Sequence, residues 1–242
     1  MSATTHQIEV GNLTVDVVRK NIKNLHLAVY PPNGRIRVAA PLNINDEAVR
    51  LMIISRTAWI KKQQLQLSAQ ARETPREYVS GESHYFKGQR YLLVVNYSDT
   101  QSGVTLRNKT FIDLNVKPGS TQEKRAAIFN AWYREELKSE ILALIIKWEN
   151  IIGVNVNEWA IKKMKTKWGS CNIAKKRLLL NLELAKKPTH CLEYIIAHEM
   201  THLLERHHNE RFMALLDKFL PQWRLYREEL NNIILSHEEW TL

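Results

Sequence analysis

The feature that most constrains this chain is a His-Glu-x-x-His sequence inside an apolar helical pattern over residues 194–203. On an α-helix, residues four positions apart lie about 40° apart around the axis and about 6 Å apart along it. His198 and His202 therefore project from one face and can share one tetrahedral Zn²⁺ through their ring nitrogens. Glu199 flanks the same face, where a carboxylate can take a proton from an activated water.

The composition bounds the class of protein. The chain has 242 residues, of which 44% are hydrophobic and 25% charged, as in globular proteins with one large or two small domains. Residues 1–10 show no signal-peptide pattern, and the apolar runs are too short to span a membrane. The 2 cysteines, Cys171 and Cys191, make no disulfide framework. We therefore expect a cytoplasmic protein without a membrane partner.

The chain is strongly basic, with a formal net charge of +10. This charge favours anionic partners, namely nucleic acid, nucleotides or an acidic polypeptide; the alternative is a surplus that only aids solubility. The window from residue 161 to residue 177 contains no acidic residue. Its basic residues are Lys162, Lys163, Lys165, Lys167, Lys175, Lys176 and Arg177.

The first half of the chain reads as strands and one helix. Alternating apolar residues predict hairpins over 7–18 and 25–39, and Asn45 is a suitable N-cap for a helix that follows it. Further strands are predicted over residues 84–86, 91–96, 103–107 and 110–116. A composition break over residues 117–120 ends this part.

The second half has a different character. Helices are predicted over residues 121–150, 209–220 and 221–235, with strands over 154–162 and 177–184. Pro188 suits the start of the helix that carries the motif. We therefore expect an α+β protein with a β-rich N-terminal domain at 1–118. A catalytic domain at 119–242 would be mostly helical, with a small sheet and the active-site helix.

A catalytic zinc site usually has three protein ligands and one open position. His207 and His208 are the downstream candidates, but on a continuous helix they would lie about 140° and about 240° around the axis from His202. The helix must therefore end soon after Leu204, and the chain must turn back. Asn209 can cap the next helix.

Residues outside the motif extend the pattern. Trp-Gly-Ser-Cys stands at 168–171, Leu-Asn-Leu at 180–182, and a histidine six residues after His202 precedes Phe212, Pro221 and Trp223. In the N-terminal half, the matching features are Pro41, Trp-Ile-Lys-Lys at 59–62 and the strand at 85–91. Together these features resemble the YgjP-like/SprT-like metallopeptidase family over most of the chain.

The resemblance implies a gluzincin-like C-terminal half that holds one zinc ion per chain. It implies His198, His202 and His208 as the ligands and Glu199 as the catalytic residue. The family usually has asparagine before the third histidine, whereas this chain has His207. The choice of His208 over His207 rests on the spacing of six residues.

The Trp-Gly-Ser-Cys segment has two interpretations. It can bind an extended substrate along a strand edge, or Trp168 can fill the core while Gly169 permits a tight turn. Cys171 is not expected to bind metal, and Cys191 reads as a core thiol. The expected substrate contacts are Lys165, Lys167, Trp168, Ser170 and Asn181.

These features predict a zinc-dependent hydrolase in which Glu199 accepts and returns a proton, and the resemblance makes the peptide bond the default substrate. One alternative is hydrolysis of an anionic substrate such as a nucleotide phosphoanhydride, with lysines binding phosphate; the chain lacks a glycine-rich phosphate loop, which counts against it. A second alternative is a nucleic-acid-associated protein that acts on DNA-bound protein. The sequence predicts no oligomeric state.

Overall fold

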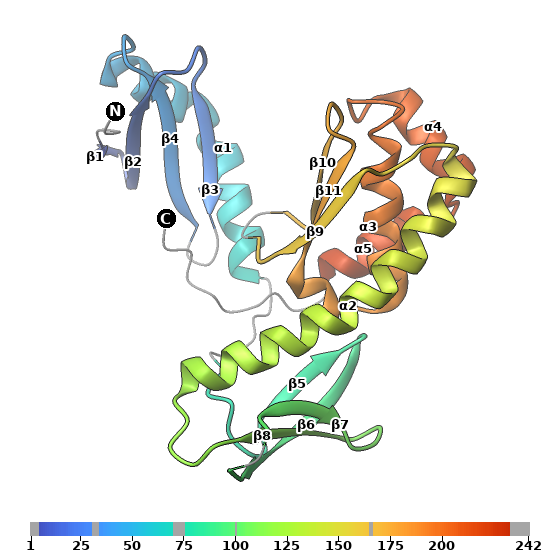
Figure 1. The fold of residues 1–242 in the computed structure, drawn as a ribbon. Coiled ribbons are helices and arrows are strands. Elements are labelled where there is room, and N and C mark those ends of the chain that lie inside the picture. Colours follow the sequence, from blue (N-terminus) through green and yellow to red (C-terminus); the bar gives the residue numbers. More distant parts are fainter. Residues whose placement is uncertain (1–4, 31–33, 70–75, 100, 165–166, 233–242) are drawn as a thin grey trace. The chain divides into compact units, whose positions relative to one another are not determined.

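The computed structural model describes residues 5–30, 34–69, 76–99, 101–164 and 167–232. These residues form two compact units, one from β1 to α1 and the other from β5 to α5 (Figure 1). The fold class is α+β, as predicted. Within the described ranges, no helix is long and apolar enough to cross a membrane.

The first unit is one sheet covered by one helix. Its strands are β1 (Thr5–Val10), β2 (Leu13–Lys20), β3 (His26–Tyr30) and β4 (Arg35–Pro41), in the order β1-β2-β4-β3. The antiparallel pairs β1–β2 and β3–β4 confirm both predicted hairpins. Helix α1 (Asp46–Ala69) begins as predicted, because Asn45 Oδ1 accepts the Ala48 N–H at 2.9 Å. Its buried face packs on the sheet through Val49, Ile53 and Ile60.

The second unit begins with a four-stranded sheet. Strands β5 (Ser83–Phe86), β6 (Gln89–Tyr97), β7 (Gly103–Leu106) and β8 (Phe111–Val116) lie in the order β5-β6-β8-β7. Helix α2 (Gln122–Ile152) follows and packs Trp132 and Tyr133 against Phe86. The sheet therefore shares one core with the helices after it. The domain boundary expected at residue 118 falls inside this unit, between β8 and α2.

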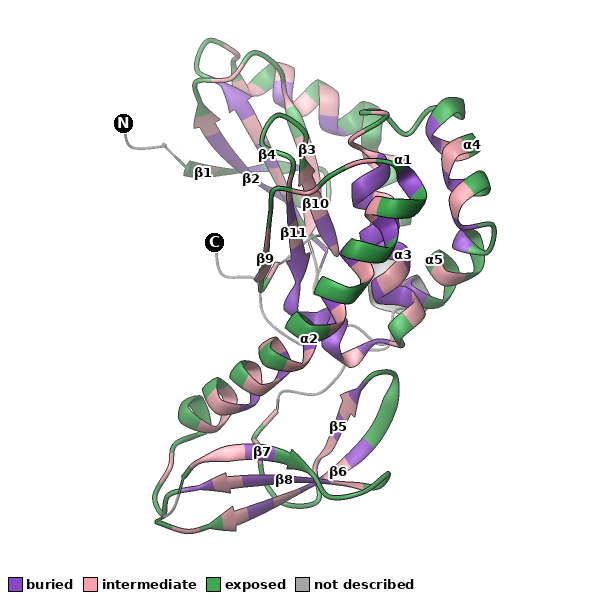
Figure 2. Ribbon diagram, turned by 45° about the vertical axis from the view of Figure 1, so that its right-hand side comes forward, coloured by how far each residue is buried: buried purple, intermediate pink, exposed green. Residues whose placement is uncertain are grey.

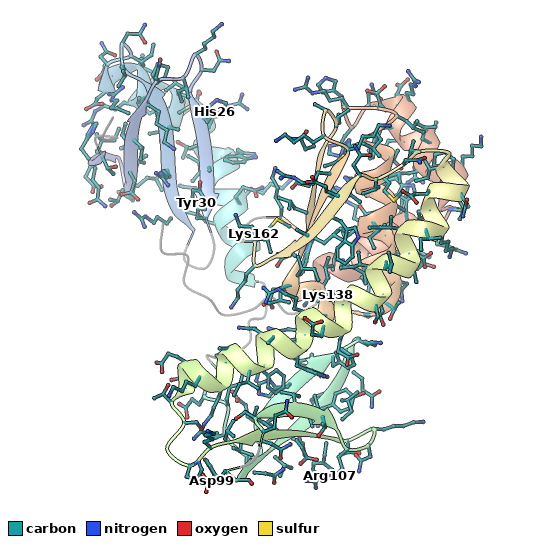
Figure 3. All side chains as sticks on the ribbon, in the orientation of Figure 1. His26, Tyr30, Asp99, Arg107, Lys138 and Lys162 are labelled. Carbon is teal, nitrogen blue, oxygen red and sulfur yellow. The ribbon has the colours of Figure 1, made fainter. Side chains whose placement is uncertain are left out.

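A smaller sheet lies farther along the same unit. It consists of β9 (Glu158–Lys162), β10 (Gly169–Asn172) and β11 (Arg177–Asn181), in the order β10-β11-β9. Lys162 is labelled at the end of β9 in Figure 3. Two sequence predictions change here: β9 starts later than residue 154, and the strand predicted to reach residue 184 ends at Asn181. The Asn181 side chain accepts the Glu183 N–H and starts a 3₁₀-helix, η1 (Leu182–Lys186).

Three helices complete the unit: α3 (Thr189–Thr201), α4 (Glu210–Phe219) and α5 (Trp223–Asn232). The remainder of the predicted last helix lies outside the described residues. Pro188 is the N-cap of α3. Helix α3 is buried over most of its length (Figure 2) and contacts α2, α4, α5 and β10. It is therefore the central helix around which this unit packs.

Candidate metal centre

The end of α3 determines which side chains can meet. The Leu203 N–H donates to the Met200 carbonyl at 3.0 Å and the Leu204 N–H to the Thr201 carbonyl at 2.9 Å. These short-range bonds close the last turn in place of a continuing helix. The chain then turns back, and Asn209 Oδ1 accepts the Phe212 N–H at 3.0 Å to start α4. The helix thus ends where the sequence argument requires.

This turn brings His198, His202 and His208 together. Each histidine offers one ring nitrogen, and these three nitrogen atoms all lie within 4.8 Å of one another. The Nε2 atoms of His198 and His208 are 3.0 Å apart, and the ring of Phe212 packs against all three imidazoles. His207 is not in this set; its main-chain N–H donates to Glu205 Oε1 at 3.1 Å. The geometry therefore favours His208 as the third donor.

The donor set fits a zinc ion. Two imidazoles on a tetrahedral Zn²⁺ place their nitrogens about 3.3 Å apart, given Zn–N bonds of about 2.0–2.1 Å. His202 Nδ1 lies 3.1 Å from the Glu205 carbonyl oxygen, so a proton on Nδ1 leaves Nε2 free as a metal donor. Burial lowers the pKa of His198 to about 3, with the neighbouring histidines acting in the same direction. Its ring is therefore neutral and can donate a lone pair.

Glu199 lies beside these histidines and is 7% exposed. Burial raises its pKa to about 7, while Lys167 and the main-chain N–H of Cys171 act against that rise. The Cys171 N–H reaches the carboxylate because β10 passes directly over it. A carboxylate that is buried from water beside three histidines that can bind a metal is suited to accept and return a proton during a reaction.

Gly169 makes that close approach possible. A Cβ atom at this position would lie 2.7 Å from Glu199 Cγ and 2.9 Å from Ile195 Cγ2. The interpretation of Gly169 as a tight-turn residue is therefore wrong, since it belongs to strand β10 and does not have a positive φ. A glycine is needed because the strand touches α3.

A pocket of about 550 Å³ surrounds the three histidines and Glu199, and we call it the metal pocket. Tyr194 packs edge-on against His198 and stacks on Trp223, which ties the pocket to α5. Three exposed cations line it from three different segments: Lys167, Arg206 and Arg227. Glu199 is the only acidic residue among the described residues that line it.

Only some of the expected substrate contacts line the metal pocket. Lys167, Trp168 and Ser170 line the metal pocket. Trp168 also packs against the core, as its structural interpretation requires, and its contact with substrate stays a prediction. Lys165 lies outside the described residues. Asn181 needs a correction: its amide donates to the carbonyls of Met164 and Lys167, and its oxygen accepts two main-chain N–H groups. A buried amide occupied in this way shapes the loop and has no group left for substrate.

Both cysteines are free thiols. Burial raises the pKa of the Cys171 thiol to about 11 and that of Cys191 to about 12. Neither belongs to the three-histidine set. Both therefore remain protonated thiols, and Cys191 belongs to the core.

Two cationic residues of the metal pocket were not identified from the sequence. Arg206 had a local signal, because it stands between the candidate ligands His202 and His208, in the turn that brings them together. Arg227 had none. It lies on α5, and only the packing of α5 against α3 brings it to the pocket.

A family model described as YgjP-like, metallopeptidase domain, matches residues 23–233. Among solved structures, the metallopeptidase zymogen of Pyrococcus abyssi abylysin is similar, with 17% identity, a TM-score of 0.35, and coverage of 37% of this chain and 90% of that chain. No curated protein matches the chain. The family match spans most of the sequence and includes the three histidines and Glu199, so the chain belongs to the YgjP-like metallopeptidase family.

Proposed function

We propose that this protein is a zinc-dependent hydrolase that cleaves peptide bonds. The observation that carries the proposal is the set of His198, His202 and His208 with the buried carboxylate of Glu199 beside it. These three imidazoles would hold one zinc ion. When bound, zinc lowers the pKa of a water ligand and polarises the carbonyl that the water attacks.

The residues of this chain would supply the remaining chemistry. Glu199 accepts a proton from the attacking water and delivers it to the leaving nitrogen. The Glu205 carbonyl fixes the ring of His202 through Nδ1. The absence of a side chain at Gly169 leaves Glu199 the room it occupies next to β10. Each of these groups is held by α3, by β10 or by the turn after α3.

An extended substrate can lie along β10. The Asn181 N–H donates to the Trp168 carbonyl at 2.9 Å, and bonding alternates along an antiparallel pair. The main-chain groups of Gly169 and Cys171 therefore point away from β11. On this outer edge the Cys171 N–H bonds to the Glu199 carboxylate, and the remaining outward main-chain groups of β10 can pair with a peptide that adds as another strand.

The test compares the wild type with Glu199→Gln on casein-derived peptides, with zinc content measured on the same samples. We expect about one zinc per chain in both proteins. Loss of a positioned acid–base group should lower kcat by about 10²-fold or more. Glu193→Gln is the matched control, because Glu193 is on the same helix and bonds to Lys147 instead. A Glu199→Gln protein with wild-type activity would refute the proposal.

A second candidate is hydrolysis of an anionic substrate such as a nucleotide phosphoanhydride. The specific observation is the ring of Lys167, Arg206 and Arg227 around the metal pocket, since such cations bind phosphate. Release of phosphate or pyrophosphate from nucleoside triphosphates distinguishes it. Release that requires Glu199, together with intact peptides, would favour this candidate over the peptidase.

A further inference from the structure

A second groove adjoins the metal pocket along the edge of β10. It has a volume of about 830 Å³ and shares Cys171, Ile173, His202 and Arg206 with the metal pocket. We call it the edge groove. His202 lines both the edge groove and the metal pocket. A ligand in the edge groove therefore lies directly next to the metal centre. A substrate strand on β10 would therefore pass through both.

The edge groove contains two guanidinium groups and no carboxylate among the described residues that line it. Arg177 and Arg206 have no ion-pair partner in the part of the chain that the structure describes. The Nε atom of Arg177 is buried and has no hydrogen-bond partner there. A buried donor without a partner is destabilising, so a ligand that accepts from Arg177 would relieve this cost.

The remaining walls are apolar. Ile173 and Leu204 are each 38% exposed, which leaves apolar surface open to a ligand, and Leu179 also lines the groove. Leu179 pairs with Ser170 and Arg177 with Asn172, so these four side chains share one face of the small sheet. The matching ligand has an apolar stem and an anionic end.

Strand geometry then selects the ligand. A peptide added at the β10 edge places alternate side chains on the face that carries Leu179 and Arg177. Strands lie about 4.8 Å apart, so the peptide is two strands away from Arg177. A glutamate has the length and charge to meet a long arginine side chain across β10, whereas aspartate is shorter.

We propose that the edge groove binds a glutamate side chain of a polypeptide substrate close to the scissile bond, with Arg177 and Arg206 pairing with its carboxylate. This proposal rests on the proposed peptidase function and names the substrate class for it. Arg177 and Arg206 would then determine specificity.

The test measures binding apart from cleavage. Fluorescein-labelled hexapeptides carrying Glu, Gln or Lys at each position in turn are titrated into zinc-loaded Glu199→Gln protein. At one position we expect Glu to bind about tenfold more tightly than Gln, the size of one charge-assisted hydrogen bond. Arg177→Gln should abolish that ratio. Lys175→Gln, which removes an exposed charge from the same hairpin outside the groove, should keep it.

Three results would overturn the proposal. They are the absence of a glutamate preference at every position, a preference that survives Arg177→Gln, and displacement of the peptide by a nucleoside triphosphate in an Arg177-dependent manner. Arg206→Gln, in an exposed turn, provides the same comparison if Arg177→Gln does not fold.

Cleavage by the wild type separates this proposal from the peptidase function. Cleavage without a glutamate preference counts against the edge groove alone. An Arg177-dependent binding preference without cleavage of any peptide counts against the peptidase function alone.

Discussion

The two halves of the metal centre are built differently. His198 and Glu199 lie on α3, whose side chains are mostly buried. His208 lies on the exposed turn of residues 203–209, which is held by the Glu205 carbonyl, the Glu205 side chain and the Asn209 cap. The comparison teaches that one half is positioned by core packing and the other by a few local hydrogen bonds. Substitutions should therefore affect the two halves in different ways.

The largest effect should come from removing a ligand on either side. At free zinc of about 100 times its Kd, zinc should raise the wild-type free energy of unfolding by about 2.7 kcal/mol. Both His198→Ala and His208→Ala should lose this increment. Without zinc, His198→Ala should cost about 1 kcal/mol, whereas the exposed His208→Ala should stay within about 0.5 kcal/mol of the wild type.

Chemical denaturation with and without zinc measures both quantities. His207→Ala is the matched control in the turn, because its ring lies outside the donor set. A His207→Ala protein that loses the zinc increment, together with a His208→Ala protein that keeps it, would reverse the assignment of the third ligand.

A smaller effect is expected from a substitution next to Glu199, in the half of the site that core packing positions. Gly169→Ala places a Cβ atom 2.7 Å from Glu199 Cγ, so the carboxylate or β10 must move. Overpacking should cost about 1–3 kcal/mol of stability, and a displaced catalytic group should lower kcat by up to about 10²-fold. Zinc should still bind, because the three imidazoles are untouched.

Gly103→Ala is the control for this change, since a Cβ there meets no atom within 4 Å. Steady-state kinetics and zinc content together decide the outcome. A Gly169→Ala enzyme with wild-type kcat would show that β10 does not constrain Glu199.

The smallest effect tests the turn. Asn209→Ala removes the N-cap of α4 and should lower stability by about 1 kcal/mol. Because this cap holds the end of the turn that carries His208, zinc affinity should fall as well. Thr121→Ala removes the corresponding cap of α2 and should lower stability by a similar amount without changing zinc affinity. Calorimetric zinc titrations of both variants make the comparison, and equal affinities would mean that the turn holds its shape without the cap.

Much of the architecture could be read from local pattern. The hairpins, the Asn45 and Asn209 caps and the end of α3 all depend on residues within a few positions of each other. The spacing of His198 and His202 gives their common direction for the same reason. Such features need no knowledge of distant segments.

Other features depended on distant segments. Residue 118 looked like a domain boundary because composition changes there, yet α2 covers the preceding sheet with its aromatic side chains. Asn181 looked like a substrate contact because it sits in a characteristic motif, yet its amide is used by the loop at Met164 and Lys167. In both cases, long-range packing overrode a local signal.

The sequence alone therefore determined the helical register of the motif, the need for a break after it, and the candidate donors. The tertiary structure decided what surrounds them: the strand edge that lies over Glu199, the cation from α5, and the edge groove with Arg177. The physical reason is the range of the interactions. Helix periodicity and capping act within about one or two turns, whereas the edge of a sheet and the walls of a pocket exist only once segments far apart in the chain have packed.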